Sequence, residues 1–305
     1  MLKYKVVDHK IFAPTQGKQN ISNLSCSSSS PEQGQLTVER FQQLSLPDAE
    51  IKQYIAKSLE GSAVKAVCLN PQIGETQIVT WADAAHQAKK PVFLRIPTME
   101  QLFKSGCSFS WRCKRVADFS AAVVLLVLLS PLMLVLTLLV RFNSPGPIFF
   151  QQWRVGQNGR LFRILKFRTM IADAEQQHHQ VMTHQQGLHK LQDDPRVTSI
   201  GRWMRQLSLD ELPQLLNVLR GEMSLVGPRP WALYDALRLS SQGQKRLNAL
   251  PGITGEWQVR ARSHLLDLDR VNEIDLEYLQ NWSLYRDFKI LLLTIPRVVF
   301  GDGAF

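Results

Sequence analysis

The chain has 305 residues, enough for one large domain or two modest ones, and its composition gives a net charge of +10. Nucleic acid is the obvious partner of a basic chain, but no zinc-finger spacing or aromatic-rich RNA-binding motif is present in the sequence, so we expect no nucleic acid partner. The N-terminus lacks the apolar core of a signal peptide, which argues against export. Four cysteines without a CxxC pair predict reduced, structural thiols: Cys26, Cys68, Cys107 and Cys113.

The first part of the chain predicts a leader followed by a small α/β domain. Residues 1–35 include a serine tract and predict a disordered leader. In residues 36–105, a strand-helix-strand order predicts a parallel pair with a helical crossover. Because no glycine-rich phosphate loop lies between its elements, we assign this domain no chemistry, and docking, regulatory or vestigial roles stay open. The predicted elements are helices at Pro47–Leu59 and Thr80–Lys89 and strands at Ala63–Leu69 and Pro91–Ile96.

An apolar run lies within residues 111–141. Its central part, Asp118–Val140, would extend about 34 Å as a straight helix, which is enough to cross a bilayer. Ser130 and Pro131 lie in the middle of this run, where proline removes a backbone donor and kinks a helix. Basic residues flank both ends, so the charges favour neither orientation. An ordinary kinked span and a broken helix that enters and leaves on the same side both fit these features.

The stretch that contains the apolar run is strongly basic. Between Trp111 and Met170, Asp118 is the only acidic residue in the sequence. We therefore expect anionic membrane lipids and phosphate esters as partners. The basic residues of this stretch are Arg112, Lys114, Arg115, Arg141, Arg154, Arg160, Arg163, Lys166 and Arg168.

Residues 142–305 predict a mostly helical domain with a short β-hairpin. Ile148–Trp153 and Leu161–Phe167 have strand composition and are joined by a turn at Gly156–Gly159. Met170–Leu191 predicts a helix that becomes irregular; its histidines fit no compact metal-ligand set, and we expect them to be solvated. These histidines are His178, His179, His184 and His189.

The C-terminal sequence predicts two amphipathic helices. In Leu265–Gln280, acidic residues alternate with leucines, and Asn281–Phe300 is too short and too polar at its start to span a membrane. Trp282, Tyr285 and Phe288, next to basic residues, suit a helix in the headgroup layer, with a core helix as the alternative. The expected fold class is therefore α+β: a small N-terminal α/β domain, a membrane helix, and a helical domain with one hairpin and interfacial helices.

An adjacent carboxylate pair, Asp210-Glu211, is the central candidate for chemistry. Arg202 and Arg205 precede it, and the turn Val226–Pro230 follows it. Arginines hold phosphate oxygens in fork geometry, so a carboxylate beside them can act as nucleophile or metal ligand toward an anionic substrate. A purely structural interpretation also holds, in which Ser208 caps a helix, Glu211 closes a capping box, and leucines form the buried stripe. Those leucines are Leu212, Leu215, Leu216 and Leu219.

These residues belong to a longer pattern that resembles the bacterial sugar transferases, the monotopic polyprenyl-phosphate phosphoglycosyl transferases. The resemblance covers the C-terminal part of the chain and leaves residues 1–110 outside it. The resemblance implies a re-entrant hairpin broken at Ser130-Pro131 in place of a spanning helix. Its motifs are Lys114–Asp118, Lys166–Met170, Asp194–Arg196, the block at residues 202–230, Leu250–Gly255 and Asn281–Ser283.

The resemblance also implies a reaction. Asp210 would attack the sugar-linked phosphate of a UDP-sugar, release UMP and carry the phosphosugar until undecaprenyl phosphate accepts it. Glu211 would act as a base or orienting group, and Asp210 would help to hold Mg²⁺. The resemblance further assigns substrate binding to residues from several segments: Arg205, Arg229, Pro228, Pro230, Lys166, Arg168 and Arg262. For Lys166 and Arg168, basic residues on a strand that faces lipid headgroups are an equal alternative.

By this resemblance the protein would begin a lipid-linked glycan for exopolysaccharide, capsule or O-antigen. It would work at the cytoplasmic face of the bacterial inner membrane, on the side where nucleotide sugars are made. Whether the protein forms a homodimer is left open. Glu256, Arg260 and Ala261 depart from the family pattern, which leaves the sugar preference undetermined. Two alternatives remain: an inactive membrane-tethered scaffold for glycan assembly, and a basic nucleic-acid-binding protein.

Overall fold

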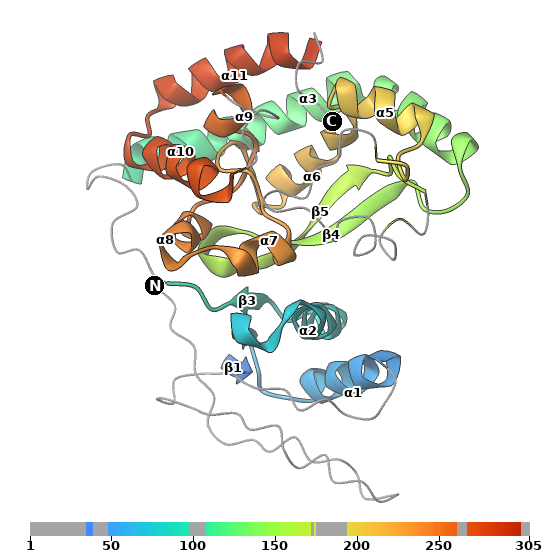
Figure 1. Ribbon diagram of the computed structural model, residues 1–305, viewed down its shortest axis with the longest axis vertical. Coiled ribbons are helices and arrows are strands. Elements are labelled where there is room, and N and C mark those ends of the chain that lie inside the picture. Colours follow the sequence, from blue (N-terminus) through green and yellow to red (C-terminus); the bar gives the residue numbers. More distant parts are fainter. Residues whose placement is uncertain are drawn as a thin grey trace, which may run out of the picture. The chain divides into compact units, whose positions relative to one another are not determined.

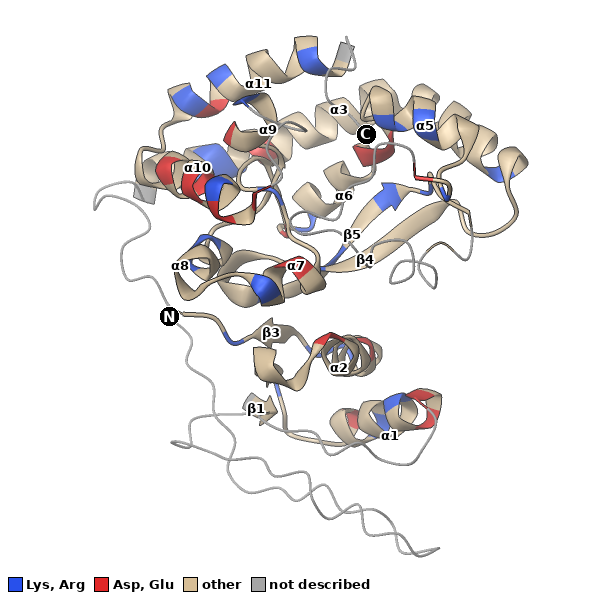
Figure 2. Cartoon of the chain, viewed as in Figure 1, with Lys and Arg blue, Asp and Glu red and all other residues tan. Residues whose placement is uncertain are grey.

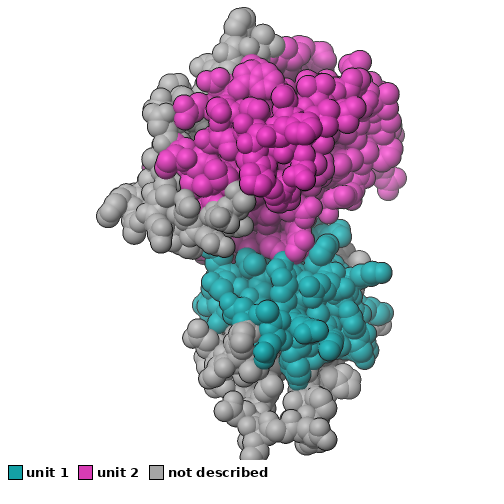
Figure 3. All heavy atoms as spheres, turned by 90° about the vertical axis from the view of Figure 1, so that its right-hand side faces the viewer, with its two compact units in different colours: residues 1–96, 158–161 teal, residues 97–157, 162–305 magenta. Residues whose placement is uncertain are grey.

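A computed structural model describes residues 35–38, 48–97, 108–171, 174, 194–260 and 267–299. The chain divides into two compact units (Figure 3). Unit 1 comprises residues 1–96 and the short segment Asn158–Leu161, and unit 2 comprises Pro97–Gln157 and Phe162–Phe305. The predicted leader at residues 1–35 lies outside the described residues, apart from Gln35.

Unit 1 is a three-stranded parallel sheet with helical crossovers (Figure 1). The predicted parallel pair is confirmed in β2 and β3, and β1 adds a third strand that the sequence did not predict. The first predicted helix agrees with α1, whereas α2 begins five residues before its predicted start because Ile78, in its first turns, is completely buried. The elements are β1 (Gln35–Val38), α1 (Asp48–Glu60), β2 (Ala66–Leu69), η1 (Pro71–Ile73), α2 (Glu75–Gln87) and β3 (Val92–Leu94).

Unit 2 begins with the long helix α3 (Ser108–Asn143), which contains the apolar run. Pro131 lies inside the continuous helix, and the Ser130 hydroxyl donates a hydrogen bond of 2.8 Å to the Val127 carbonyl. The helix is long and apolar enough to cross a membrane, only 11% of its most apolar stretch is buried, and its middle carries no charged residue (Figure 2). The structure is compatible with membrane association, and the re-entrant hairpin stays a prediction.

The predicted β-hairpin of unit 2 is confirmed as a two-stranded sheet of β4 (Phe149–Val155) and β5 (Leu161–Phe167). A second sheet pairs β6 (Ser224–Val226) with β7 (Gly252–Thr254) in parallel. Around them lie α5 (Ser199–Gln206), η3 (Leu209–Glu211), α6 (Gln214–Leu219), α7 (Leu233–Arg238), α8 (Ser241–Gln244), η4 (Lys245–Asn248), α9 (Glu256–Arg260), α10 (Leu268–Gln280) and α11 (Leu284–Val299). The predicted helix with four histidines falls outside the described residues.

A buried polar cluster, which we call the anchor cluster, joins the start of α3 to β6 and α11. Lys114 Nζ donates to Asp287 Oδ2 at 2.6 Å and to the Val226 carbonyl oxygen at 3.0 Å. Asp118 accepts from the Ser224 hydroxyl at 2.8 Å and from the backbone N–H of Leu225 at 3.2 Å. The charged end of α3 is therefore held by protein groups, although most of the helix exposes apolar side chains.

The last helix, α11, combines a buried and an exposed face. Asp287 also accepts hydrogen bonds from Tyr278 at 2.6 Å and from the Trp282 indole at 3.0 Å. Trp282 is buried, so the prediction that it belongs to an exposed interfacial face is wrong. Tyr285 and Phe288 are exposed as that prediction requires, together with Leu284, Leu291, Leu292, Leu293 and Ile295.

Candidate active site

Asp210 and Glu211 lie on a tight turn that connects α5 to α6. Ser208 adopts a left-handed backbone conformation, with φ of 53°, and the chain then forms the single 3-10 turn η3. The predicted capping box is wrong, because the Ser208 side chain does not cap the turn and α6 begins only at Gln214, after Pro213. As a result, the Glu211 carboxylate is available to side chains from other parts of the fold.

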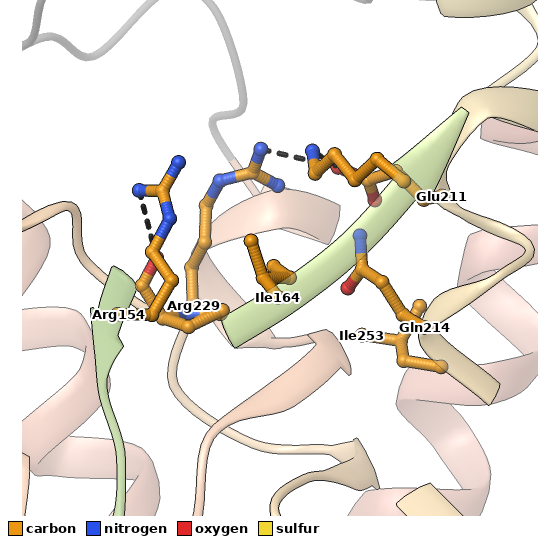
Figure 4. Close-up of a pocket in the computed structure, with 8 residues that line it drawn as sticks. Arg154, Ile164, Glu211, Gln214, Arg229 and Ile253 are labelled. Atoms are coloured by element: carbon orange, nitrogen blue, oxygen red, sulfur yellow. Dashed lines mark hydrogen bonds and ion pairs between the residues drawn. The ribbon is translucent and has the colours of Figure 1, made fainter. Parts of the chain in front are cut away.

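Two cations from distant segments contact the Glu211 carboxylate, and Figure 4 shows Arg229, one of the two, beside it. Lys166 Nζ, from β5, lies 2.7 Å from Glu211 Oε1 and 4.0 Å from Asp210 Oδ2. Arg229 Nη2, from the turn after β6, lies 3.2 Å from the same Glu211 oxygen. We call Lys166, Asp210, Glu211 and Arg229 the reaction cluster. The structure thus brings together four residues that the sequence had placed at one site.

The turn that presents Arg229 is fixed by backbone contacts with the chain around β7. Gly227 N–H donates to the Thr254 carbonyl, and Gly252 N–H donates to the Pro228 carbonyl, both at 2.9 Å. A Cβ at Gly227 would lie 2.6 Å from the Leu250 carbonyl oxygen, so only glycine permits this approach. Pro228 and Pro230 are both buried, whereas the Arg229 side chain is 41% exposed. The prolines therefore shape the turn, and Arg229 is the residue that can reach a ligand.

Burial and neighbouring charges have opposite effects on Asp210. Burial raises the pKa of Asp210 above its ordinary value, and the neighbouring Glu211 adds to this effect, whereas Lys166, Arg205 and Arg229 lower it. Burial also lowers the pKa of Lys166, against the attraction of both carboxylates. Asp210 and Lys166 are thus poorly hydrated, and groups with shifted pKa values are typical of sites that bind or transform charged substrates.

Arg205 approaches the cluster from α5. Its Nε donates a 2.9 Å hydrogen bond to the Thr169 hydroxyl, and it is one of the charges that act on Asp210. A buried ion pair between Asp194 and Arg196, with Nη2 to Oδ2 at 2.6 Å, supports the segment that leads into α5. Arg202, the other arginine before the carboxylates, is exposed.

The remaining predicted binding residues are not gathered at this site. Arg168 Nη2 donates to the backbone carbonyl and the hydroxyl of Ser144, at 2.6 and 2.8 Å, and so supports the turn that follows α3. Arg168 does not line the pocket beside Glu211, and its substrate role stays a prediction. Arg262 lies outside the described residues.

A small pocket lies beside the reaction cluster. Sequence reasoning missed two of its polar residues, Arg154 on β4 and Gln214 at the start of α6. Arg154 lies outside the motifs of the resemblance, and Gln214 lies within the 202–230 block without a role assigned to it. Asp210 itself does not line this pocket, although Lys166 and Glu211 do. The complete lining is Arg154, Ile164, Lys166, Glu211, Gln214, Arg229, Pro230 and Ile253.

The predicted cofactor Mg²⁺ is compatible with the residues of the cluster. Within the described ranges, no three His, Cys, Asp or Glu side chains form a group that could enclose a metal ion. However, Mg²⁺ usually keeps several waters and takes only one or two carboxylates together with substrate phosphates. Asp210 fits that role, because Lys166 Nζ is 4.0 Å from its Oδ2 and leaves the oxygen unbonded to that cation, whereas Glu211 Oε1 is engaged by Lys166 and Arg229.

Comparison of the sequence with known proteins identifies a family and several relatives. Residues 109–301 match the family described as bacterial sugar transferase. Over 194 residues the chain is 44% identical to the galactosyl transferase CpsE of Streptococcus agalactiae serotype III (strain NEM316), covering 63% of this chain and 43% of that protein. It is also 44% identical over 200 residues to the exopolysaccharide production protein ExoY of Sinorhizobium fredii (strain NBRC 101917 / NGR234), covering 63% of this chain and 88% of the relative.

A third relative carries a more specific name. The chain is 44% identical over 200 residues to the UDP-glucose:undecaprenyl-phosphate glucose-1-phosphate transferase of Caulobacter vibrioides (strain ATCC 19089 / CIP 103742 / CB 15), with 63% of this chain and 72% of that protein covered. The matched region contains α3, the reaction cluster and the pocket, and excludes all the described residues of unit 1 before α3.

Proposed function

The chain belongs to the bacterial sugar transferase family, and from this premise we propose that it transfers a sugar 1-phosphate from a UDP-sugar to undecaprenyl phosphate. The observation that carries the proposal is the Asp210-Glu211 pair with Lys166 and Arg229 converging on it from two other segments. Relatives named for glucose and for galactose transfer support the sugar-phosphate chemistry and leave the sugar open.

In the first proposed step, Asp210 is the nucleophile. One of its carboxylate oxygens bonds to the sugar-linked phosphorus, and the bond from that phosphorus to the bridging oxygen breaks. The bridging oxygen leaves with the electron pair as part of UMP, and the phosphosugar remains on Asp210. Splitting the transfer in two is useful because two anions would otherwise have to meet directly.

In the second proposed step, an oxygen of undecaprenyl phosphate bonds to the same phosphorus. The bond to the Asp210 oxygen breaks, and its electron pair restores the carboxylate. Lys166 and Arg229 lower the repulsion between the incoming phosphate and the site, and Glu211 fixes both cations in place. Mg²⁺, held by Asp210 and substrate phosphates, would supply further neutralisation of phosphate charge.

We propose that this chemistry takes place at the cytoplasmic face of the bacterial inner membrane. The apolar surface of α3 and the exposed apolar side chains of α11 support membrane association. A membrane-bound site is needed because the proposed acceptor is a lipid, whereas the donor is a water-soluble nucleotide sugar. The polymer that follows would be an exopolysaccharide, a capsule or an O-antigen.

The test is release of UMP by the membrane-purified protein given undecaprenyl phosphate, Mg²⁺ and a panel of UDP-sugars. We expect release with at least one donor and none from the Asp210→Asn variant. Asp269→Asn, which removes a carboxylate from the exposed start of α10, is the matched control and should retain full activity. If the wild type releases no UMP with any donor, the proposal fails for UDP-sugars and an inactive scaffold becomes the better interpretation.

A further inference from the structure

The pocket beside the reaction cluster contains two hydrogen-bond donors that no described residue uses. They are Arg154 Nε and Gln214 Nε2, and both atoms are buried. Gln214 is only 2% exposed, and Figure 4 shows its amide nitrogen directed toward the space beneath Glu211 and Arg229. A buried donor without a partner is destabilising, and retaining two of them around one pocket indicates an acceptor that arrives with a ligand.

Arg154 is held in this position by its neighbours. Its Nη2 donates to Gln152 Oε1 at 2.6 Å, and its Nη1 lies 3.5 Å from the Pro230 carbonyl oxygen. An isolated β-bridge between Arg154 and Ala232 places β4 alongside the chain that leaves the Arg229 turn. The guanidinium is therefore oriented by uncharged acceptors, and burial lowers the pKa of Arg154 as expected for a cation removed from water.

Arg154 and Asp210 lie at different parts of the site. Figure 4 shows the Arg229 side chain between Arg154 and Glu211, and Glu211 directly follows Asp210 in the chain. Arg154 and Glu211 both line the pocket, whereas Asp210 does not. Arg229 thus lies between Arg154 and the carboxylate pair that contains the nucleophile. A ligand with two linked phosphates can place one phosphate near Asp210 and the other near Arg154.

We propose that Arg154, with Gln214, binds the phosphate that leaves with the nucleotide, while the other phosphate of the donor is attacked by Asp210. This inference rests on the proposed function, and it deepens it by assigning the leaving group to a specific wall of the pocket. When the bond between the reacting phosphorus and the bridging oxygen breaks, the electron pair leaves on that oxygen, so negative charge grows on the nucleotide phosphate. A guanidinium and a carboxamide N–H aimed at that phosphate stabilise the growing charge.

The inference predicts different effects of Arg154 on the two half-reactions. UMP contains the leaving phosphate, so it should bind to the same wall, whereas undecaprenyl phosphate reacts after UMP has gone. Loss of Arg154 should weaken UMP binding and slow the bond cleavage that forms UMP. It should leave the attack of the lipid phosphate on the phosphosugar-protein almost unchanged. A purely structural role for Arg154 would impair both halves equally.

The experiment measures the affinity of UMP for the full-length protein in detergent by calorimetry, with three variants. We expect Arg154→Gln to weaken UMP binding by about tenfold or more, because it removes a charged donor. Gln214→Met should weaken it by about threefold or more. Arg163→Gln is the matched control, because Arg163 is on the neighbouring strand β5, stacks over Trp153 at 5.0 Å and does not line the pocket. Its affinity for UMP should equal that of the wild type.

A second measurement follows the phosphosugar-protein, isolated after UMP release, as it reacts with undecaprenyl phosphate. The Arg154→Gln rate should stay within about twofold of the wild type. Unchanged UMP affinity in both pocket variants would overturn the inference, as would an equal loss in both half-reactions. A variant that binds UMP normally but reacts slowly with the lipid would assign Arg154 to the acceptor phosphate and so overturn it too.

Binding and turnover also distinguish this inference from the proposed function. If the wild type binds UMP but releases none from any UDP-sugar, the transfer proposal fails while the effect of Arg154 on UMP affinity can still be measured. If the wild type does not bind UMP at all, the assignment of Arg154 is wrong, whatever the turnover.

Discussion

The anchor cluster and the reaction cluster each place a lysine beside two acidic side chains, yet their polar atoms have different partners. In the anchor cluster, Asp287 accepts hydrogen bonds from a lysine, a tyrosine and a tryptophan, and Asp118 accepts from a hydroxyl and a backbone N–H. In the reaction cluster, the Asp210 carboxylate has Lys166 only at 4.0 Å, and two donors of the adjoining pocket have no partner among the described residues.

In a chain with many buried charges, this difference distinguishes the anchor cluster, which supports the fold, from the reaction cluster, which we assign to function. A buried ion pair is tolerable when every lone pair and N–H is satisfied, and the anchor cluster comes close to this condition. Burial and the neighbouring Asp287 raise the pKa of Tyr278 well above its ordinary value, so this tyrosine stays a donor. The pocket beside the reaction cluster leaves the buried donors of Arg154 and Gln214 without partners among the described residues, and a phosphate ligand would supply the acceptors.

The largest expected effect is on the rate of transfer. Asp210→Asn should lower UMP release by about 10⁴-fold or more, because the nucleophile is removed. It should not lower the temperature of unfolding, because burial raises the pKa of Asp210 and so disfavours the charge that asparagine lacks. The measurements are UMP release and thermal unfolding in detergent. A clear drop in unfolding temperature would show that Asp210 stabilises the fold, contrary to the comparison of the two clusters.

The next effect is on stability. Asp287→Asn should destabilise the protein by about 3 to 5 kcal/mol, because it removes the carboxylate 2.6 Å from the buried Lys114 ammonium and leaves Asp118 only at 4.0 Å. Adding Lys114→Met removes the second charge and should restore part of the loss, which a double-mutant cycle in urea would measure. Additive losses in the two single variants would mean that the pair does not act as a unit.

A smaller effect concerns the pH dependence of transfer. The pKa of Asp210 is already raised, and Lys166 opposes the rise, so Lys166→Met should raise this pKa further. Because the nucleophile must be ionised, the acid side of the pH-rate profile should move to higher pH, with activity at neutral pH lowered by about tenfold to 100-fold. Lys57→Met, on the exposed side of α1, is the control. A lower rate with an unmoved acid limb would mean that Lys166 acts on the substrate and not on Asp210.

The smallest effect on activity is expected at Arg168. Its contacts with Ser144 place it at the turn after α3, so Arg168→Gln should change the KM for the UDP-sugar by less than about threefold. Stability should fall by about 1 to 3 kcal/mol, because the hydrogen bonds of a buried cation are lost. An increase in KM of tenfold or more at unchanged stability would instead support the substrate role that the sequence predicts.

Local sequence patterns predicted the local parts of this molecule well. The parallel β2–β3 pair, the hairpin and the helix α10 follow from periodicity and turn residues, and the Lys166, Asp210, Glu211 and Arg229 grouping was anticipated from the resemblance. The left-handed Ser208 was not anticipated, because a non-glycine residue seldom adopts positive φ, and the Ser208–Glu211 spacing matched a capping box instead.

The pocket could not be predicted, because it is assembled from segments that are far apart in the chain. Arg154 comes from β4, outside the motifs of the resemblance, and Gln214 comes from α6, within the 202–230 block but without a role assigned to it. Gln214 lies outside the predicted stripe of buried leucines, so periodicity did not predict that its side chain is buried at a pocket. Its unpartnered amide becomes visible only when β5, α6 and the Arg229 turn are in place.

The hydrogen bond between Lys114 and Asp287 joins residues separated by 173 positions. At a synthesis rate of about 5 to 20 residues per second, roughly 10 to 35 seconds pass on the ribosome between the two. During that interval α3 can already enter the lipid, although β6 and α11, which supply the hydrogen-bond partners of its polar end, have not yet both been synthesised. A helix that enters the lipid in this interval would do so before the protein holds its polar end, and a nascent chain that stops before Asp287 would leave Lys114 with Asp118 at 4.0 Å as its carboxylate.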